Sequence, residues 1–98
     1  MTHTEKGYEF GLFAATRAEK VMQPFIFVAK KGKVKKGGLS HPGEEFVYVL
    51  KGQMKFRVGN VEYLMSPGDG LYFDAQEEHD LQPITDEVRY LAVFAELS

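Results

Sequence analysis

Short runs of apolar residues, interrupted by polar positions, follow one another along most of the chain. Residues 54–58 read Met-Lys-Phe-Arg-Val and alternate with a period of two, which is typical of a strand with one buried face. Residues 16–21 form a short segment of mixed charge, for which we expect an exposed turn. Further runs of strand-forming residues occupy positions 8–13, 25–29, 45–50, 61–64, 71–73, 79–82 and 88–94.

Turn signals separate these runs. Lys51-Gly52 and Gly59-Asn60 predict tight hairpins, and residues 66–70, Ser-Pro-Gly-Asp-Gly, predict a strong turn. Short strands with a turn roughly every 8–12 residues are typical of a β-sandwich or a barrel. Because no helix alternates with the strands, we expect an all-β fold: a small antiparallel jelly-roll barrel, which leaves few open sheet edges.

Length and composition fit a single small domain. With 98 residues, of which 44% are hydrophobic, the chain can form one core but not two. We therefore expect residues 1–98 to form one domain, with residues 1–6 disordered. So small a domain gains from association, and its 8 Phe and 5 Tyr residues predict a homodimer.

Charge and cysteine content narrow the classes of function. The absence of cysteine excludes disulfides, thiolate metal sites and a cysteine nucleophile. No apolar run approaches the roughly 20 residues of a membrane span, and the first residues lack a signal-peptide core, so we expect a cytoplasmic protein without membrane contact. A net charge of −2 argues against direct nucleic-acid binding. We interpret the lysines at 30, 31, 33, 35 and 36 as a solvated hairpin edge.

Three residues form the candidate site. His41 and Glu45 are four positions apart, so they share a face if both lie in extended backbone. Val47 and Val49 have the same parity as Glu45, and a carboxylate among valines needs a partner because burying an unpaired charge is costly. His79 is the natural third member, because the one other histidine lies near the start of the chain.

Two imidazoles and a carboxylate suit a divalent metal and leave coordination positions open. Without a metal, the same three residues form a site for an organic acid or a satisfied polar network. Glu77, Glu78 and Asp80 flank His79 in what we interpret as a solvated loop, and their charges favour a raised pKa of His79. The tyrosines are expected in the core or on a dimer face, and one of them is a candidate for the pocket; they are Tyr48, Tyr63, Tyr72 and Tyr90.

Two segments resemble the motifs of a known family. Residues 41–52, His-Pro-Gly-Glu-Glu-Phe-Val-Tyr-Val-Leu-Lys-Gly, resemble the first motif of the cupins. Residues 67–75, Pro-Gly-Asp-Gly-Leu-Tyr-Phe-Asp-Ala, followed by His79, resemble the second. The resemblance implies a cupin barrel with His41, Glu45 and His79 as metal ligands, and Fe, Mn, Zn or Ni as the metal.

The chain also departs from the cupin pattern. Leu39 stands where the first motif usually has another histidine, so one of the four usual ligands is missing. Asp74 replaces a common proline of the second motif, and Pro83 replaces a common asparagine. The departure at Leu39 predicts weakened metal binding, with water in the vacant position.

A looser resemblance concerns the effector domains of helix-turn-helix/cupin transcription regulators. It rests on residues 7–10, 22–25, 71–75 and 91–94. It implies a sensor module that binds a small polar or anionic ligand; any DNA-binding part would belong elsewhere, since the sequence has no helix-turn-helix pattern. The alternatives are a small metal-dependent enzyme of dioxygenase or isomerase type, acting on a small polar metabolite, and a structural or storage protein.

Overall fold

The structure is a computed structural model that describes residues 2–3, 8–12, 21–35 and 37–96. The described part is all-β, which confirms the predicted fold class, and none of it forms a helix long and apolar enough to cross a membrane. The strands are β1 (Thr2–His3), β2 (Tyr8–Leu12), β3 (Met22–Lys30), β4 (Glu44–Lys51), β5 (Met54–Val58), β6 (Val61–Met65), β7 (Gly70–Asp74), β8 (His79–Pro83) and β9 (Glu87–Ala95).

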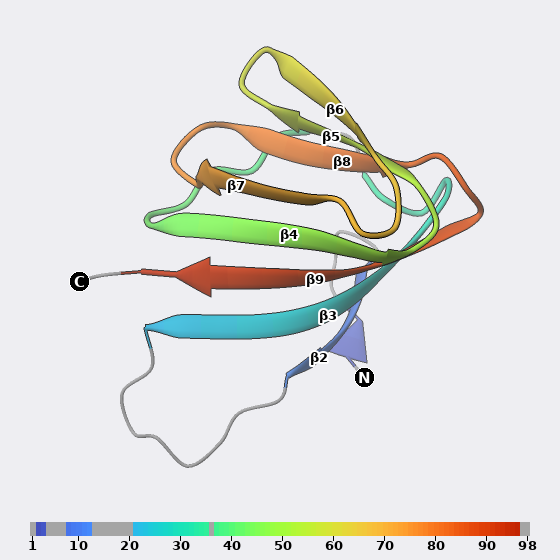
Figure 1. The fold of residues 1–98 in the computed structure, drawn as a ribbon, viewed down its shortest axis with the longest axis horizontal. Coiled ribbons are helices and arrows are strands. Elements are labelled where there is room, and N and C mark those ends of the chain that lie inside the picture. The colour runs from blue at the N-terminus through green and yellow to red at the C-terminus, as the bar shows by residue number, and fades with distance from the viewer. Residues whose placement is uncertain (1, 4–7, 13–20, 36, 97–98) are drawn as a thin grey trace.

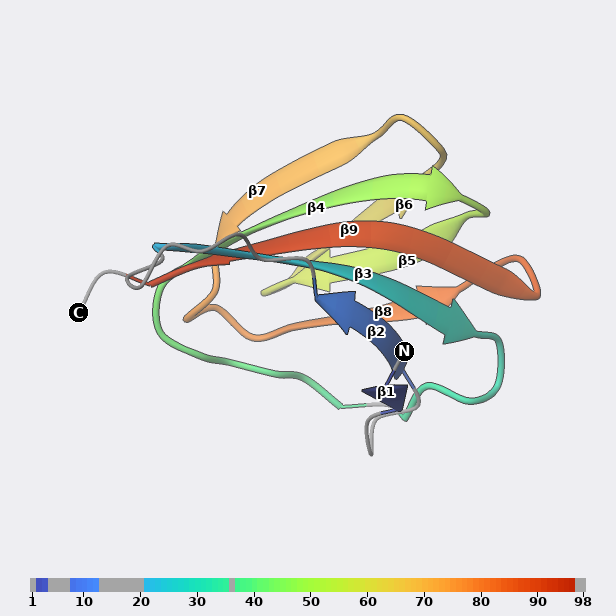
Figure 2. The ribbon, with the colours of Figure 1, turned by 90° about the horizontal axis from the view of Figure 1, so that it is seen from below.

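The strands form two antiparallel sheets. The larger has the order β1-β2-β3-β9-β4-β7, and the smaller has the order β6-β5-β8. Figure 1 shows β3, β9, β4 and β7 in succession, with β8, β5 and β6 gathered above them, and Figure 2 shows the same succession from below. The sheets together form the predicted jelly-roll barrel, in which β9 joins two strands, β3 and β4, that lie far from it in the sequence.

The observed strand bounds differ most from the expected ones near the start of the chain. β3 begins at Met22 and therefore extends three residues further than the apolar run 25–29 indicated. Of residues 1–6, only Thr2 and His3 are described, and they pair with β2. The expected turn at 16–21 lies outside the described residues except for Val21.

The core fills the space between the two sheets. In β5, Met54, Phe56 and Val58 are buried while Lys55 is exposed, so the period-two pattern of this segment is realised as predicted. Burial of such side chains contributes roughly 25 cal/mol per Å² of apolar surface removed from water. The core cluster comprises Ala29, Val34, Val47, Val49, Met54, Phe56, Val58, Met65, Phe73, Leu81, Val88, Tyr90 and Ala92.

The lysine-rich segment after β3 is a surface loop. Lys30, Lys31, Lys33 and Lys35 are exposed, whereas Val34 between them is buried and belongs to the core cluster. One apolar side chain thus anchors the loop while its cations remain in water. Lys36 lies outside the described residues.

A matched pair of Val→Ala substitutions tests the position of the core. Val49 is fully buried and Val61 is 52% exposed. Val49→Ala should lower the free energy of unfolding by about 2–3 kcal/mol, because two buried methyl groups are lost and a cavity remains, whereas Val61→Ala should change it by less than about 0.5 kcal/mol. Urea denaturation followed by circular dichroism measures both. Equal losses would show that β4 does not point Val49 into the core.

Candidate metal centre

Glu45 is a buried carboxylate on the inner face of the larger sheet. It is 5% exposed and lies one position into β4, where it pairs with Phe73 of β7 and Phe94 of β9. Val47 and Val49 follow it on the same face and are fully buried, as the sequence predicted. A charge in such surroundings requires a partner of opposite charge or a hydrogen-bond donor.

A turn, and not strand alternation, brings His41 to Glu45. β4 begins only at Glu44, so the condition for a shared strand face, extended backbone at both residues, is not met. His41 N–H donates to the carbonyl of Ala75 (2.9 Å), and Ala75 N–H donates to that of Gly43 (3.0 Å), which pins this segment to the end of β7. Gly43 has φ +94°, and a Cβ there would lie 2.2 Å from the Ala95 carbonyl oxygen, so only glycine fits this turn.

His79 enters the same site from the other sheet. It is 4% exposed, opens β8, and exchanges two backbone hydrogen bonds with Leu39, at 2.8 and 2.9 Å. Its ring packs edge-on against Phe73, with the centroids 4.8 Å apart, and parallel to Phe56. Two aromatic rings therefore pack against the imidazole.

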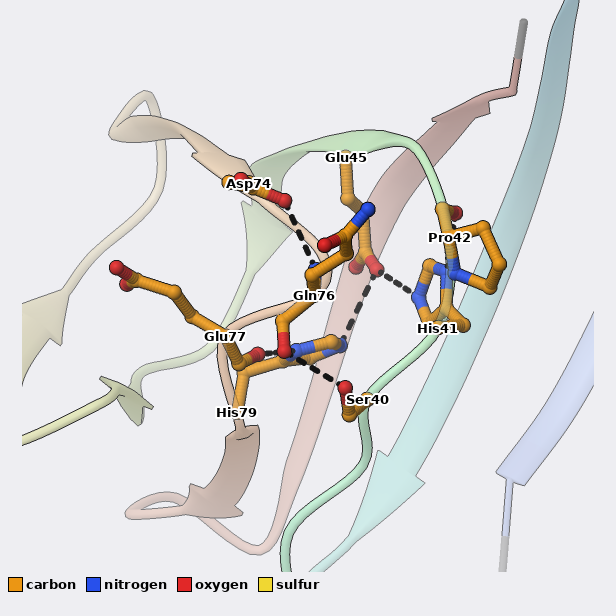
Figure 3. Close-up of polar contacts among 8 residues, drawn as sticks. All are labelled: Ser40, His41, Pro42, Glu45, Asp74, Gln76, Glu77 and His79. Atoms are coloured by element: carbon orange, nitrogen blue, oxygen red, sulfur yellow. Dashed lines mark hydrogen bonds and ion pairs between the residues drawn. The ribbon is translucent and has the colours of Figure 1, made fainter. Parts of the chain in front are cut away.

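The two imidazoles converge on one carboxylate oxygen, so the structure brings together the three residues that the sequence singled out. Nε2 of His41 lies 3.1 Å from Oε1 of Glu45, and Nε2 of His79 lies 3.4 Å from the same atom. One ligating atom from each residue lies within 4.8 Å of the others. Figure 3 shows the Glu45 carboxylate between the two rings, with a contact to each.

Backbone carbonyls determine which nitrogen of each ring faces the site. Nδ1 of His79 donates to the carbonyl of Glu77 (2.8 Å), and Nδ1 of His41 donates to that of Pro42 (3.2 Å). A carbonyl only accepts, so each Nδ1 carries a proton, and in a neutral ring Nε2 then offers a lone pair. Two lone pairs facing a carboxylate are unfavourable until a cation, either a proton or a metal ion, lies between them.

The spacing of these atoms fits a single divalent ion. Metal–nitrogen and metal–oxygen bonds of about 2.1 Å place neighbouring ligand atoms about 3.0 Å apart in octahedral geometry and about 3.4 Å apart in tetrahedral geometry. The observed separations from Oε1 to the two Nε2 atoms are 3.1 and 3.4 Å. The two distances from the carboxylate oxygen are therefore compatible with one metal ion shared by the three residues.

Opposing influences act on the pKa of His79. Burial is the largest single influence and lowers it, but the hydrogen bond and charge of Glu45, together with the Glu77 carbonyl, outweigh it and raise the pKa above its usual 6.5. Asp80 makes the smallest contribution. The acidic residues around His79 thus act less through their charges than the sequence suggested.

Two of those acidic residues have another partner. Arg57 of β5 donates hydrogen bonds to the carboxylates of Glu78 and Asp80, each at 2.9 Å, and the bond to Asp80 is the main cause of a raised pKa of Arg57. The interpretation of this segment as a solvated loop therefore holds for the exposed Glu77 but not for half-buried Asp80. The contact with Arg57 fixes β8 to β5 beside the site.

The three residues lie in a pocket of about 260 Å³ whose walls are mostly aromatic. The sequence predicted a polar pocket; the structure instead places a polar cluster among apolar side chains. Tyr90 is the tyrosine that lines it, whereas Tyr48, Tyr63 and Tyr72 are exposed. The other lining residues are Phe27, Leu39, Phe56, Asp80, Leu81 and Phe94. Phe27 and Phe94 lie at positions of β3 and β9 whose side chains point inwards. The alternation of inward and outward positions along these strands is the sequence signal that could have identified them.

The three departures from the cupin motifs have different consequences. Leu39 lines the pocket next to His79, so the position of the missing histidine borders the candidate metal centre. Asp74 is exposed and accepts a hydrogen bond from Gln76 N–H (2.9 Å), which supports the turn after β7. Pro83 is buried at the end of β8. Only the departure at Leu39 therefore bears directly on metal binding.

An antiparallel double-sheet barrel with a histidine–carboxylate cluster in its pocket places this chain among the small β-barrel domains. The chain belongs to the cupin family: the family model described as "Cupin domain" matches residues 25–94. No curated protein matches the sequence.

Solved structures share the fold at low sequence identity. The Cupin_2 domain of an XRE family transcriptional regulator from Enterobacter cloacae has a TM-score of 0.80 and 12% identity, over 94% of this chain and 99% of that one. A cupin superfamily protein from Desulfitobacterium hafniense has a TM-score of 0.74 and 15% identity, over 99% and 84%. At these identities the likeness is one of fold alone.

An enzyme is also among the similar structures. Hydroxypropylphosphonic acid epoxidase from S. wedmorenis has a TM-score of 0.76 and 20% identity, over 90% of this chain and 50% of the epoxidase chain. The Fe(II) form of HppE with an alternative substrate gives a TM-score of 0.76 over 89% of this chain and 49% of that one. The chain thus spans about half the length of these two matches.

The raised pKa of His79 makes the stability of metal-free protein depend on pH. Because folding favours the protonated ring, its stabilising contribution should be complete below about pH 6.5 and should be lost as the pH rises through the folded-state pKa. NMR titration of His79, with urea denaturation at several pH values in the presence of a chelator, measures both. Glu45→Gln keeps the shape of the side chain, removes its charge and should lower this pKa. A folded-state pKa at or below 6.5 in the wild type would contradict the assignment.

Proposed function

We propose that this chain is a ligand-sensing cupin domain in which His41, Glu45 and His79 hold a divalent metal ion. The observation that carries the proposal is the orientation of the two imidazoles. Each ring donates from Nδ1 to a backbone carbonyl and turns Nε2 towards the same oxygen of Glu45. Such outer contacts of metal-binding histidines hold the ring and raise its basicity.

The charge and walls of the pocket define the class of ligand. A divalent ion with one carboxylate and two neutral imidazoles retains a net positive charge, and three protein ligands leave coordination positions free. Those positions open into a pocket that contains Phe27, Tyr90 and Phe94. We therefore propose a small anionic ligand, such as a carboxylate, with an apolar body that packs against these rings. A pocket of about 260 Å³ is smaller than most drug-binding cavities, which favours a small metabolite.

The similarity to the cupin domain of a transcriptional regulator supports a sensing role for this chain. This chain matches that domain along nearly its whole length, so the shared unit is the cupin barrel itself. In this proposal the barrel binds the metabolite, and a DNA-binding part elsewhere supplies the response. A cytoplasmic location fits such a role and stays a prediction.

A second candidate function is that of a metal-dependent enzyme. One specific observation favours it: two histidines and one carboxylate are the ligand set of many non-haem Fe(II) oxygenases, and an Fe(II) form of HppE shares the fold. Oxygen consumption by anaerobically iron-loaded protein, with a panel of small carboxylates and phosphonates, distinguishes the two functions. Ligand-dependent consumption that Glu45→Ala abolishes would establish the enzyme, whereas tight ligand binding without consumption favours the sensor.

Calorimetric titration with Zn²⁺, Mn²⁺ and Ni²⁺ tests the metal centre. His79→Ala should weaken binding by at least about tenfold because one of three ligands is lost, and Leu39→His should tighten it because position 39 borders the site. Ser40→Ala is a matched control, since this exposed hydroxyl points to the Gln76 carbonyl and not into the site. Equal affinities in wild type and His79→Ala would exclude a shared site and leave a metal-free polar pocket.

The ligand class has its own test. Benzoate and short branched carboxylates should bind more tightly to metal-loaded protein than to chelator-treated protein, because the ion supplies the positive charge. Phe94→Ala should weaken the binding of the carboxylates by about tenfold while metal affinity remains within a factor of two to three, since the ring contributes only apolar contact. Binding that is equally tight with and without metal would refute an anion held by the ion.

A further inference from the structure

The segment before β8 determines how the ring of His79 is oriented. Nδ1 of His79 donates to the carbonyl of Glu77 (2.8 Å), a contact drawn in Figure 3. Glu78 lies between these two residues in the chain, and its own carbonyl accepts a hydrogen bond from Gly59 N–H (2.8 Å) in the turn between β5 and β6. A contact that holds Glu78 in place therefore also bears on His79.

Arg57 binds this segment on both sides of His79. Its guanidinium donates to the carboxylates of Glu78 and Asp80, each at 2.9 Å, and these two residues directly precede and follow His79. It also donates to the carbonyl of Gly59 (2.7 Å). Arg57 lies on the outer face of the smaller sheet, since the residues on either side of it in β5 are buried. Its influence on the pocket therefore passes through the backbone of this segment.

Glu78 also covers the segment that leads into β4. A Cβ at Gly38 would overlap Cγ and Cδ of Glu78 and would lie 2.6 Å from its Oε1. The same Oε1 accepts the hydrogen bond from Arg57. Leu39 comes next in the chain and exchanges two backbone hydrogen bonds with His79. The Glu78 side chain therefore lies across Gly38, between this segment and Arg57.

Space, and not backbone conformation, makes position 38 suit a glycine. Gly38 is not one of the described glycines with a positive φ, so its backbone would accept another residue. The atoms that a Cβ would meet first belong to the Glu78 side chain, which is 63% exposed and can turn into solvent. Gly38→Ala should therefore displace Glu78 from Arg57 with little strain elsewhere.

We propose that Arg57 and Glu78 are positioning residues of the proposed metal centre. They hold the segment that carries His41 against the segment that carries His79, and they do so from outside the pocket, since neither is among the residues that line it. This inference rests on the proposed function, because it assigns a role at the same site. An exposed ion pair adds little to the stability of a fold, so its loss should affect the alignment of the ligands more than folding.

A double-mutant cycle with Zn²⁺ tests this role. Gly38→Ala and Glu78→Ala should each weaken Zn²⁺ binding about fivefold in calorimetry, because the two segments that carry the histidines lose their common contact. The double variant should bind as weakly as either single variant, since the alanine at position 38 then has no Glu78 side chain to displace. Glu78→Gln keeps an acceptor for Arg57 and should retain the affinity within about twofold.

Two controls separate positioning from charge and from stability. Glu62→Ala removes a similarly exposed carboxylate, which lies opposite Arg57 on β6 and pairs with Lys55, and it should leave Zn²⁺ affinity unchanged. Val49→Ala opens a cavity in the core further along β4 and should lower stability without changing the affinity. Circular dichroism verifies that each variant is folded.

Chelator-treated protein gives a readout that does not depend on the metal. In ¹⁵N NMR, the proton on Nδ1 of His79 should exchange with water about fivefold faster in Glu78→Ala than in the wild type, because the Glu77 carbonyl is held less firmly. Val49→Ala and Glu62→Ala should keep the wild-type rate. If the wild type binds no Zn²⁺, the metal proposal fails, and the exchange rates still decide whether Glu78 positions His79.

Three results would overturn the proposal. Losses that add in the double variant would show that Gly38 and Glu78 act separately. An equal loss of affinity in Glu62→Ala would assign the effect to charge alone. A wild-type exchange rate of the His79 proton in Glu78→Ala would exclude a positioning role.

Discussion

The buried carboxylate of Glu45 imposes the main constraint on this structure. A carboxylate that is 5% exposed among valines and aromatic rings is tolerated only if an opposite charge or a hydrogen-bond donor compensates it. Both Nε2 atoms face its Oε1, and both rings are held from behind by backbone carbonyls. The site therefore requires protons or a metal ion between these three residues, and the two compete. The same contacts that raise the pKa of His79 bring together the three residues that we propose hold a metal ion once the proton leaves.

Strands position Glu45 and His79, whereas a turn positions His41. The Gly43 turn delivers His41, and the paired backbone of Leu39 and His79 aligns the two sides of the barrel opening. Because each of these contacts involves main-chain atoms, replacing a side chain in the site leaves the frame in place. The backbone that positions the site is thus independent of the side chains that form it, which suits a fold that hosts different chemistry in different relatives.

The two faces of β4 have different roles, because its successive side chains point alternately into the barrel and outwards. Its inward residues carry the carboxylate and the core valines, and its outward residues carry an aromatic surface with charged ends. Neighbouring residues Glu44 and Glu45 thus have unrelated environments: one is exposed beside Asp74, and the other is buried between two histidines. A single strand thereby connects the pocket with the outer face of the larger sheet.

The sequence by itself determined the all-β class, the inward valines of β4 and the hairpins around β5 and β6. It also indicated which three residues come together in the pocket, namely His41, Glu45 and His79. Period-two burial and turn chemistry are local, so they can be read from neighbouring residues. Only the tertiary structure decided how β9 lies between β3 and β4, which aromatic residues line the pocket, and that a turn orients His41. It also paired Arg57 with Asp80. These features depend on strand register and loop path, and they arise between segments that are distant in the chain and carry no local pattern.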